Sequence, residues 1–551
     1  MNLAVADVPV PVDVGHWLLA ILPIVVLLVL LVPLRWRAPE AAPVAMLVTG
    51  IVALTAFKTP WHTLAIASAK GVWDAVFILW VVWPALLLYQ VTKQAGAYDA
   101  LRKGISKFSQ NELFIVIALA WVFASFLQGI AGFGAPVAVV VPLLIAVGVK
   151  PVYSVAFGIL AHAWARFFGT LGVGWLATLR VTAGEDGGHS FHVTRAAFES
   201  GALILISCYL GGAFIVWMYG RWAAVKHAWP LVLILGTILG CGQMLSTLFS
   251  PELSTFLGGA VALLALVPLS RWRRYREPIS GIPDRRAMAE RDVDAEAERP
   301  PLMGLGMSFV PYLVLTFVTL CVLLIDPLND QLSRWRLGMA FPEVTTRYGI
   351  TNAAVSKYSP ITPLTHPGTM LLITAIVVWI VYRSKNYFEL WKQRAVPERI
   401  GMALLTDAVP ASVPVIAFLI MSRVLDHSGQ TLTIAHGIAD VTPPNVYAAV
   451  ASLIGALGAF ITNSSTASNV LFGRVQYDVA QLHNLSAETV IATQAAGSAY
   501  GNAIAPANVV LGTSIAGIKG QEGAVLRMTA LWALIVAVLT GLVTVLMVVL
   551  S

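Results

Sequence analysis

Charged residues are scarce in this sequence. Only 11% of its 551 residues are Asp, Glu, Lys or Arg, whereas 58% are hydrophobic, and a soluble globular domain carries about 25% charged residues. This shortage excludes a soluble enzyme. Uncharged runs such as residues 17–34 are long enough to cross the hydrocarbon core of a lipid bilayer as a helix. The sequence therefore predicts an all-α polytopic membrane protein with about 12–14 transmembrane segments.

Cysteine is almost as scarce, because the chain has only three. Each lies inside an apolar run and none has a CxxC partner, which excludes a disulfide framework and a cysteine metal site. His189 and His192 stand together in a polar loop, but a membrane-embedded enzyme needs a convergent set of acids and histidines. We therefore predict that the protein is not an enzyme and uses no metal and no cofactor.

The positive charges gather in short loops between the apolar runs. A net charge of +7 would suit a nucleic-acid partner, but the chain has no soluble basic domain that would bind one. Basic clusters in residues 93–107, 221–226 and 383–399 instead mark cytoplasmic loops. Because Arg35 and Arg37 directly follow the first apolar run, that run is expected to be an uncleaved anchor with the N-terminus outside.

One polar segment divides the chain into two parts. Residues 271–300 hold eight arginines and seven acids, with too little apolar surface to form a core. We expect a flexible cytoplasmic linker here. It would join an N-terminal membrane half, residues 1–270, to a C-terminal membrane half, residues 301–551.

Several apolar segments are interrupted in the middle by Gly, Pro, Asn or Ser. The interrupted segments are residues 126–139 and 158–175 in the first half and residues 460–473 and 492–509 in the second. One offset relates both pairs, because Phe460 follows Phe126 by 334 residues and Asn502 follows Phe168 by the same number. Backbone groups freed by such breaks cannot face lipid. They must line protein or a water-filled cavity.

Charge alternation places the two halves in the membrane in opposite directions. The helix that leads to residue 126 starts from a cytoplasmic loop, whereas the equivalent helix near residue 446 starts outside. Two inverted repeats, each with a re-entrant hairpin and a broken helix, are the architecture of secondary transporters. Close packing of small residues is the alternative explanation for one break, but it does not explain four breaks in one register. A passive channel is less favoured because no ring of like charge is present.

Three motifs carry a resemblance to a known family. The segments LQGIAGFGAPVAV, FITNSSTASNVLF and GNAIAPANV (residues 127–139, 460–472 and 501–509) resemble those of the L-lactate permease family, and the likeness covers nearly the whole chain. The resemblance implies a symporter of the bacterial inner membrane. Such a protein imports L-lactate, glycolate or a related small 2-hydroxy-monocarboxylate, usually with protons. The partners implied are this anion, the coupling ion and lipid, and a homodimer is one option.

The resemblance also implies where the substrate binds. The family commonly has Glu at the position of Gln128 and often Lys at that of Asn502, so this chain lacks two charges that the family would have. Sodium coupling, or a more anionic substrate such as a sulfonate or a dicarboxylate, is therefore an alternative. The residues expected to bind substrate are Gln128, Gly132, Phe133, Gly134, Ala135, His162, Arg166, Thr462, Asn463, Ser464, Ser465, Thr466, Ser468, Asn469 and Asn502.

We expect specific roles for three charged or titratable residues inside apolar segments. Arg166 either binds the substrate carboxylate through its bidentate guanidinium or pairs with protein groups and stiffens the bundle. His162 lies four residues earlier on the same helical face, where it either reaches the substrate or only packs. Asp407 is the candidate for proton coupling, unless it lies at the cytoplasmic end of its helix.

Two further pairs of charges lie in the second half. Arg474 and Asp478 are one helical turn apart, and we expect an internal ion pair. Arg423 and Asp426 lie at the end of an apolar run, and we expect a surface pair.

Overall fold

The computed structural model is built almost entirely of helices. It describes residues 10–31, 33–34, 36–106, 109–130, 132, 135–182, 191–278, 282, 284–289, 301–393, 399–518 and 520–550. The helices up to residue 276 are α1 (Val14–Leu31), α2 (Ala38–Thr55), α3 (Trp61–Gln94), α4 (Ala97–Ser106), α5 (Glu112–Ile117), α6 (Ala124–Ile130), α7 (Ala135–Ala146), α8 (Pro151–Ala163), α9 (Gly169–Thr182), α10 (Val193–Gly236), α11 (Gly242–Ser246), α12 (Ser254–Arg271) and α13 (Arg273–Arg276).

Twelve further helices follow residue 300 among the described residues. They are α14 (Leu305–Ser308), α15 (Val310–Leu324), α16 (Asp326–Leu332), α17 (Pro367–Ser384), α18 (Tyr387–Lys392), α19 (Ile400–Ser428), α20 (Gln430–Val441), α21 (Pro444–Thr462), α22 (Ser465–Leu482), α23 (Ala487–Gly501), α24 (Pro506–Ile515) and α25 (Glu522–Leu550). Short π-helical or 3-10 turns at Ala118–Phe123, Thr237–Cys241, Pro251–Leu253 and Asn502–Ile504 join some of them. The predicted polytopic helical class is confirmed.

The number of long spans is lower than the apolar runs predicted. Among the described residues, 10 helices are long and apolar enough to cross a membrane, against the expected number of about 12–14. The longest of them, Val193–Ser246, turns sharply at Gly220 and Arg221, where the φ of Arg221 is 53°. The remaining apolar segments form shorter helices such as Pro136–Ile145 and Pro151–Ala163, because the breaks end them before they cross.

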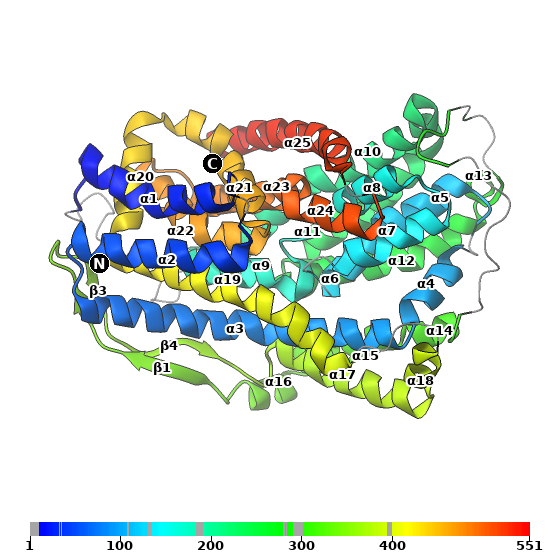
Figure 1. The fold of residues 1–551 in the computed structure, drawn as a ribbon, viewed down its shortest axis with the longest axis horizontal. Coiled ribbons are helices and arrows are strands. Elements are labelled where there is room, and N and C mark those ends of the chain that lie inside the picture. Colours follow the sequence, from blue (N-terminus) through cyan, green and yellow to red (C-terminus); the bar gives the residue numbers. More distant parts are fainter. Residues whose placement is uncertain are drawn as a thin grey trace.

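A small strand region is an exception to the all-α prediction. Strand β1 (Leu337–Phe341) pairs with β4 (Val355–Ile361), and β2 (Val344–Thr345) pairs with β3 (Thr351–Asn352), both antiparallel. The hairpin lies along the outside of α3 (Figure 1). It therefore covers one end of the helical bundle, and Tyr358 of β4 is buried there at 2% exposure.

The offset of 334 residues relates whole helices as well as their breaks. Moved by 334 residues, α3 would span 395–428, where α19 spans Ile400–Ser428, and α8 would span 485–497, where α23 spans Ala487–Gly501. The packing of the two halves corresponds as well, because α17 packs on α3, and α2, the counterpart of α17 at this offset, packs on α19. The inversion of the two halves across the membrane stays a prediction.

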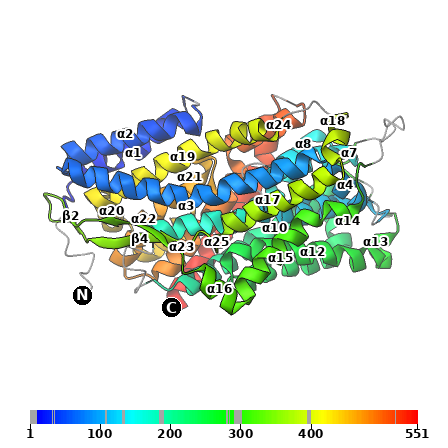
Figure 2. The same cartoon turned by 90° about the horizontal axis from the view of Figure 1, so that it is seen from below.

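The long helices α3 and α19 form a central pair along the length of the molecule. They lie side by side, with α17 beside α3 (Figure 2). Their close approach depends on Gly71, because a Cβ at this position would lie 2.6 Å from the Cα of Ile420. The described backbone of α3 and of α19 is helical throughout. The pair therefore forms a continuous frame. Helices α9 and α22, which each begin at a break and are called the broken helices below, pack against it.

Part of the polar segment 271–300 packs against the bundle. The backbone N–H of Lys150 donates to the carbonyl of Ala287 at 2.7 Å, and the guanidinium of Arg285 lies 2.6 Å from the carboxylate of Glu112. The rest of the predicted linker, residues 279–281, 283 and 290–300, lies outside the described residues.

Candidate functional site

Two helix breaks of the first half lie against each other. The chain leaves α6 after Ile130 and starts α7 at Ala135, and it leaves α8 at Ala163 and starts α9 at Gly169. A Cβ on Gly169 would lie 2.7 Å from the amide nitrogen of Gln128, and a Cβ on Gly132 would clash with the hydroxyl of Thr170. Gln128 and Gly132 therefore adjoin the second break, which agrees with the paired breaks expected from the sequence.

Three predicted residues of this region are not described in full. Phe133 and Gly134 lie outside the described residues, and the backbone of Ala135 is described as the first residue of α7 without its side chain. Their part in substrate binding stays a prediction. Thr170 was missed by the sequence analysis, although it follows Gly169 within the predicted segment 158–175.

The equivalent breaks of the second half are joined by asparagines. Asn463 ends α21 in the left-handed conformation, with φ 56°, and its side-chain oxygen accepts from the backbone N–H of Asn508 at 3.2 Å. The amide of Asn508 donates to the carbonyl of Asn502 at 3.1 Å. Among the described residues, the amide nitrogen of Asn502 has no hydrogen-bond partner although the residue is buried. A buried free donor of this kind suits a polar ligand.

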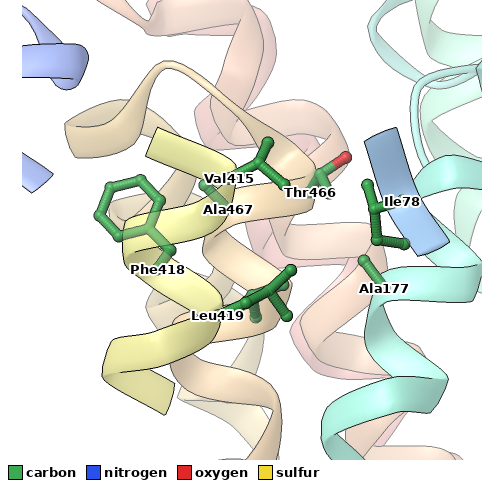
Figure 3. Close-up of a pocket in the computed structure, with 8 residues that line it drawn as sticks. Ile78, Ala177, Val415, Phe418, Leu419, Thr466 and Ala467 are labelled. Carbon is green, nitrogen blue, oxygen red and sulfur yellow. The ribbon is translucent and has the colours of Figure 1, made fainter. Parts of the chain in front are cut away.

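The first turn of α22 faces a small pocket. Ser464 caps this helix, and its hydroxyl accepts from the N–H of Ala467 at 3.2 Å; Thr462 bonds to Ser464 across the break. Thr466 points towards the pocket from α22, opposite Ile78 of α3 (Figure 3). The pocket is lined by Ile78, Ala177, Val415, Phe418, Leu419, Thr466, Ala467 and Val470. It therefore lies between two broken helices, α9 and α22, and the frame pair α3 and α19.

Ser468 and Asn469 bond to neighbouring helices. The hydroxyl of Ser468 donates to the carbonyl of Gly455 at 2.7 Å, and the amide of Asn469 donates to Ser498 at 3.0 Å. Gln494 of α23 donates to both of these predicted residues. The sequence analysis missed Gln494, although a lone amide in the apolar run 487–501 was a usable signal. Ser465 is buried at the start of α22.

His162 and Arg166 contact each other, as their spacing predicted. The guanidinium Nη2 of Arg166 lies 2.9 Å from His162 Nε2, and His162 Nδ1 lies 2.5 Å from the carbonyl of Gly158. A guanidinium only donates, so the histidine accepts at Nε2 and donates from Nδ1. In the described part of the chain, Arg166 has no acidic partner within ion-pair distance and its Nε has no hydrogen-bond partner.

Asp407 lies on the frame helix α19 and contacts α3 rather than one of these breaks. It is exposed in the second turn of α19, where its carboxylate accepts from the amide of Gln90 at 2.6 Å. The coupling role of Asp407 stays a prediction.

A buried ionic cluster, not recognised in the sequence analysis, joins the frame helices to α9. Asp74 of α3 is fully buried and accepts from Arg423 Nε of α19 at 2.8 Å and from the Tyr358 hydroxyl at 2.9 Å. Arg180 of α9 lies 3.7 Å from Asp74, and Arg423 also donates to the Arg180 carbonyl. The expected surface pair of Arg423 with Asp426 is wrong, because Arg423 is only 4% exposed and pairs with Asp74 instead.

A second ionic group joins α22 to α19. Arg474 Nε lies 3.1 Å from Asp478 on its own helix and 3.4 Å from Asp426 on α19. The predicted internal pair of Arg474 and Asp478 is confirmed. The contact with Asp426 was not predicted, because residues on separate helices show no common spacing in the sequence.

Replacing Asn463 has two effects, one on its left-handed backbone conformation and one on its hydrogen bond to Asn508. We expect Asn463→Gly to be about 1 kcal/mol more stable than Asn463→Ala, since glycine adopts positive φ without strain. Both variants lose the bond to Asn508. Thermal unfolding in detergent measures the first effect and substrate uptake the second. Equal melting temperatures for the glycine and alanine variants would show that the left-handed backbone conformation at position 463 does not affect stability.

These observations define a polytopic membrane permease, with paired helix breaks and buried polar groups inside a bundle of apolar helices. The sequence profile of the L-lactate permease family matches residues 16–551. The chain belongs to this family. Similar proteins include the glycolate permease GlcA of Escherichia coli K12, 27% identical over 96% of this chain and 95% of the relative. The L-lactate permeases of Escherichia coli K12 and Bacillus subtilis 168 are 26% and 23% identical over 96% of this chain and 95% of each relative.

One solved structure is similar in outline. The YdaH transporter of Alcanivorax borkumensis superposes with a TM-score of 0.46 and 15% sequence identity, and the match covers 87% of each chain.

Proposed function

We propose that the protein is a secondary active transporter, a symporter, that imports L-lactate or a related small 2-hydroxy-monocarboxylate such as glycolate. The observation that carries the proposal is the pairing of helix breaks, Gln128 with Gly169 in one half and Asn463 with Asn508 in the other. Family membership supports it, and relatives named for L-lactate and for glycolate indicate the class of substrate.

The chemistry of the breaks suits a hydroxy acid. The carboxylate would bind the guanidinium of Arg166, a partly buried cation without an acidic partner in the described part of the chain. The N-terminus of α22 offers a second positive potential close to Thr466. Amide and hydroxyl groups such as those of Asn502 and Ser465 would bond to the 2-hydroxyl group.

The coupling ion is proposed to be a proton. Sodium is the alternative, because neutral Asn and Ser oxygens around residues 463–469 also suit that ion. A more anionic substrate, a sulfonate or dicarboxylate, is the other alternative, because Arg166 has no acidic partner in the described part of the chain. We further propose a bacterial inner-membrane location with the N-terminus outside.

Counterflow in proteoliposomes tests this function. Purified protein in vesicles loaded with unlabelled L-lactate should take up labelled L-lactate, and external glycolate should compete with it. An inward proton gradient should drive accumulation, and a sodium gradient should not. Stronger competition by a dicarboxylate or a sulfonate would establish the more anionic substrate instead. If no C2 to C4 hydroxy acid exchanged and neither gradient drove uptake, the proposed function would be wrong.

A further inference from the structure

Two carboxylates share one guanidinium where α22 meets α19. Arg474 Nε lies 3.1 Å from Asp478 and 3.4 Å from Asp426, and it has no third carboxylate within 4 Å in the described part of the chain. An acid that shares its cationic partner with a second acid is costly to bury in its charged form. A proton on that acid removes this cost.

Asp478 is the acid whose surroundings favour the proton. It is fully buried, and its Oδ2 has no hydrogen-bond partner among the described residues. A buried carboxylate oxygen without a donor is unfavourable when charged, whereas the protonated acid is neutral there. The side chains of Asp426 and Arg474 are 20% and 25% exposed. A proton can therefore reach Asp478 along this partly open pair.

The other charges around the pair stabilise Asp426 in its ionised form. Among the described residues, Arg423 and His427 of α19 and Lys70 of α3 lie near Asp426, whereas Arg474, Asp426 and Tyr447 of α21 lie near Asp478. Helices α9, α20 and α23 also pack against α22. Their described ionisable side chains form no ion pair or hydrogen bond with Asp478, and these are Arg180, His436, Asp440, Glu488 and Tyr500.

We propose that Asp478 is the proton-binding group of this transporter, and that its protonation state decides whether Arg474 is paired within α22 or across to α19. This proposal rests on the proposed function. With the proton on Asp478 Oδ2, Asp426 is the single counter-ion of Arg474 and ties the broken helix to the frame. When the proton leaves, Asp478 neutralises Arg474 within α22 at i,i+4 spacing, and the tie to α19 weakens. One site thus links proton binding to movement between α22 and the frame.

Asp478→Asn tests the proposal in the full-length protein reconstituted in vesicles. We expect the variant to keep L-lactate counterflow and to lose proton uptake driven by L-lactate. An imposed pH difference of about one unit supports up to about tenfold accumulation by a one-proton symporter, and the variant should show none. Asp478→Glu should restore part of the accumulation. Such a partial recovery would show that proton movement requires a carboxylic acid at this position.

A matched control is Glu199→Gln. Glu199 also pairs with an arginine at i,i+4 spacing, Arg195 at 2.6 Å, but its second oxygen accepts from Thr489 at 2.7 Å. Because both oxygens have donors, no proton is expected on Glu199, and its variant should keep coupled uptake. Asp407→Asn tests the rival site. If it abolished proton coupling while Asp478→Asn kept it, Asp478 would be excluded.

Infrared spectroscopy separates a failure of this proposal from a failure of the proposed function. At neutral pH the wild type should show a protonated carboxylic-acid band that Asp478→Asn lacks, whatever the substrate proves to be. The melting temperature should change little, because the neutral amide replaces a neutral acid. Absence of the band, or a large fall in melting temperature, would show Asp478 to be an ionised structural partner and would overturn the proposal.

Discussion

Replacing Asp74 with alanine is expected to lower the free energy of unfolding by about 3–5 kcal/mol, enough to deplete the folded protein in the membrane. Asp74 is fully buried and accepts from Arg423 and Tyr358, with Arg180 at 3.7 Å. Its removal leaves two arginines in the core without their carboxylate. Thermal unfolding in detergent and the yield of monodisperse protein measure the effect.

Two further variants show whether the effect comes from uncompensated charge. Tyr358→Phe removes one hydrogen bond to Asp74 and leaves both ion pairs, so it should cost only about 1.5–3 kcal/mol. In an Arg423→Leu background, Asp74→Ala should cost less than it does alone, because one of the stranded charges is already absent. An Asp74→Ala protein that melted with the wild type would show that the cluster does not stabilise the fold.

The helix breaks could be predicted from the sequence because their signals are local. Glycine, proline and asparagine favour a helix end through their own backbone preferences, although Pro84 in α3 and Pro414 in α19 lie within continuous helices. Asn463 is the plainest case, since it ends α21 in the left-handed conformation. The regular offset between Phe126 and Phe460 extended this local information to the whole helix order.

The buried ionic cluster could not be predicted in the same way. Arg423 and Asp74 are 349 residues apart, and only the packing of α3 against α19 brings them together. A partial signal existed, because Lys70 and Asp74 stand four residues apart inside the apolar run 61–94. Charges within a span are expected to have buried partners. The partner itself depends on tertiary structure, as does the place of the strand hairpin that brings Tyr358 over Asp74.

The two ionic groups lie at the same end of the frame. Asp74 is in the first half of α3, and Arg423 and Asp426 are in the last two turns of α19. Arg180 belongs to the last turn of α9, and Asp478 to the last turns of α22. Both broken helices are therefore held to the frame by charge at the ends remote from their breaks, which leaves the breaks themselves free of ion pairs within the described residues.

Arg166 is a partly buried charge that, unlike Asp74, has no ion-pair partner in the described part of the chain, and its replacement should stop transport without harming the fold. Arg166→Ala removes a cation that has His162 at 2.9 Å as its neighbour and, in the described part of the chain, no carboxylate partner. A charge pair with the substrate carboxylate is worth about 2 kcal/mol or more, so the alanine variant should bind L-lactate at least about 30-fold more weakly. Counterflow at several L-lactate concentrations measures this loss.

The conservative variant and the melting temperature decide between binding and stiffening. Arg166→Lys should recover little transport, because an ammonium lacks the planar fork that meets a carboxylate at two points. Arg527→Ala, at an exposed arginine of α25, should transport normally. If Arg166 instead stiffened the bundle, its alanine variant would melt earlier, as the Asp74 variant should. An unchanged melting temperature together with normal counterflow would remove Arg166 from both roles.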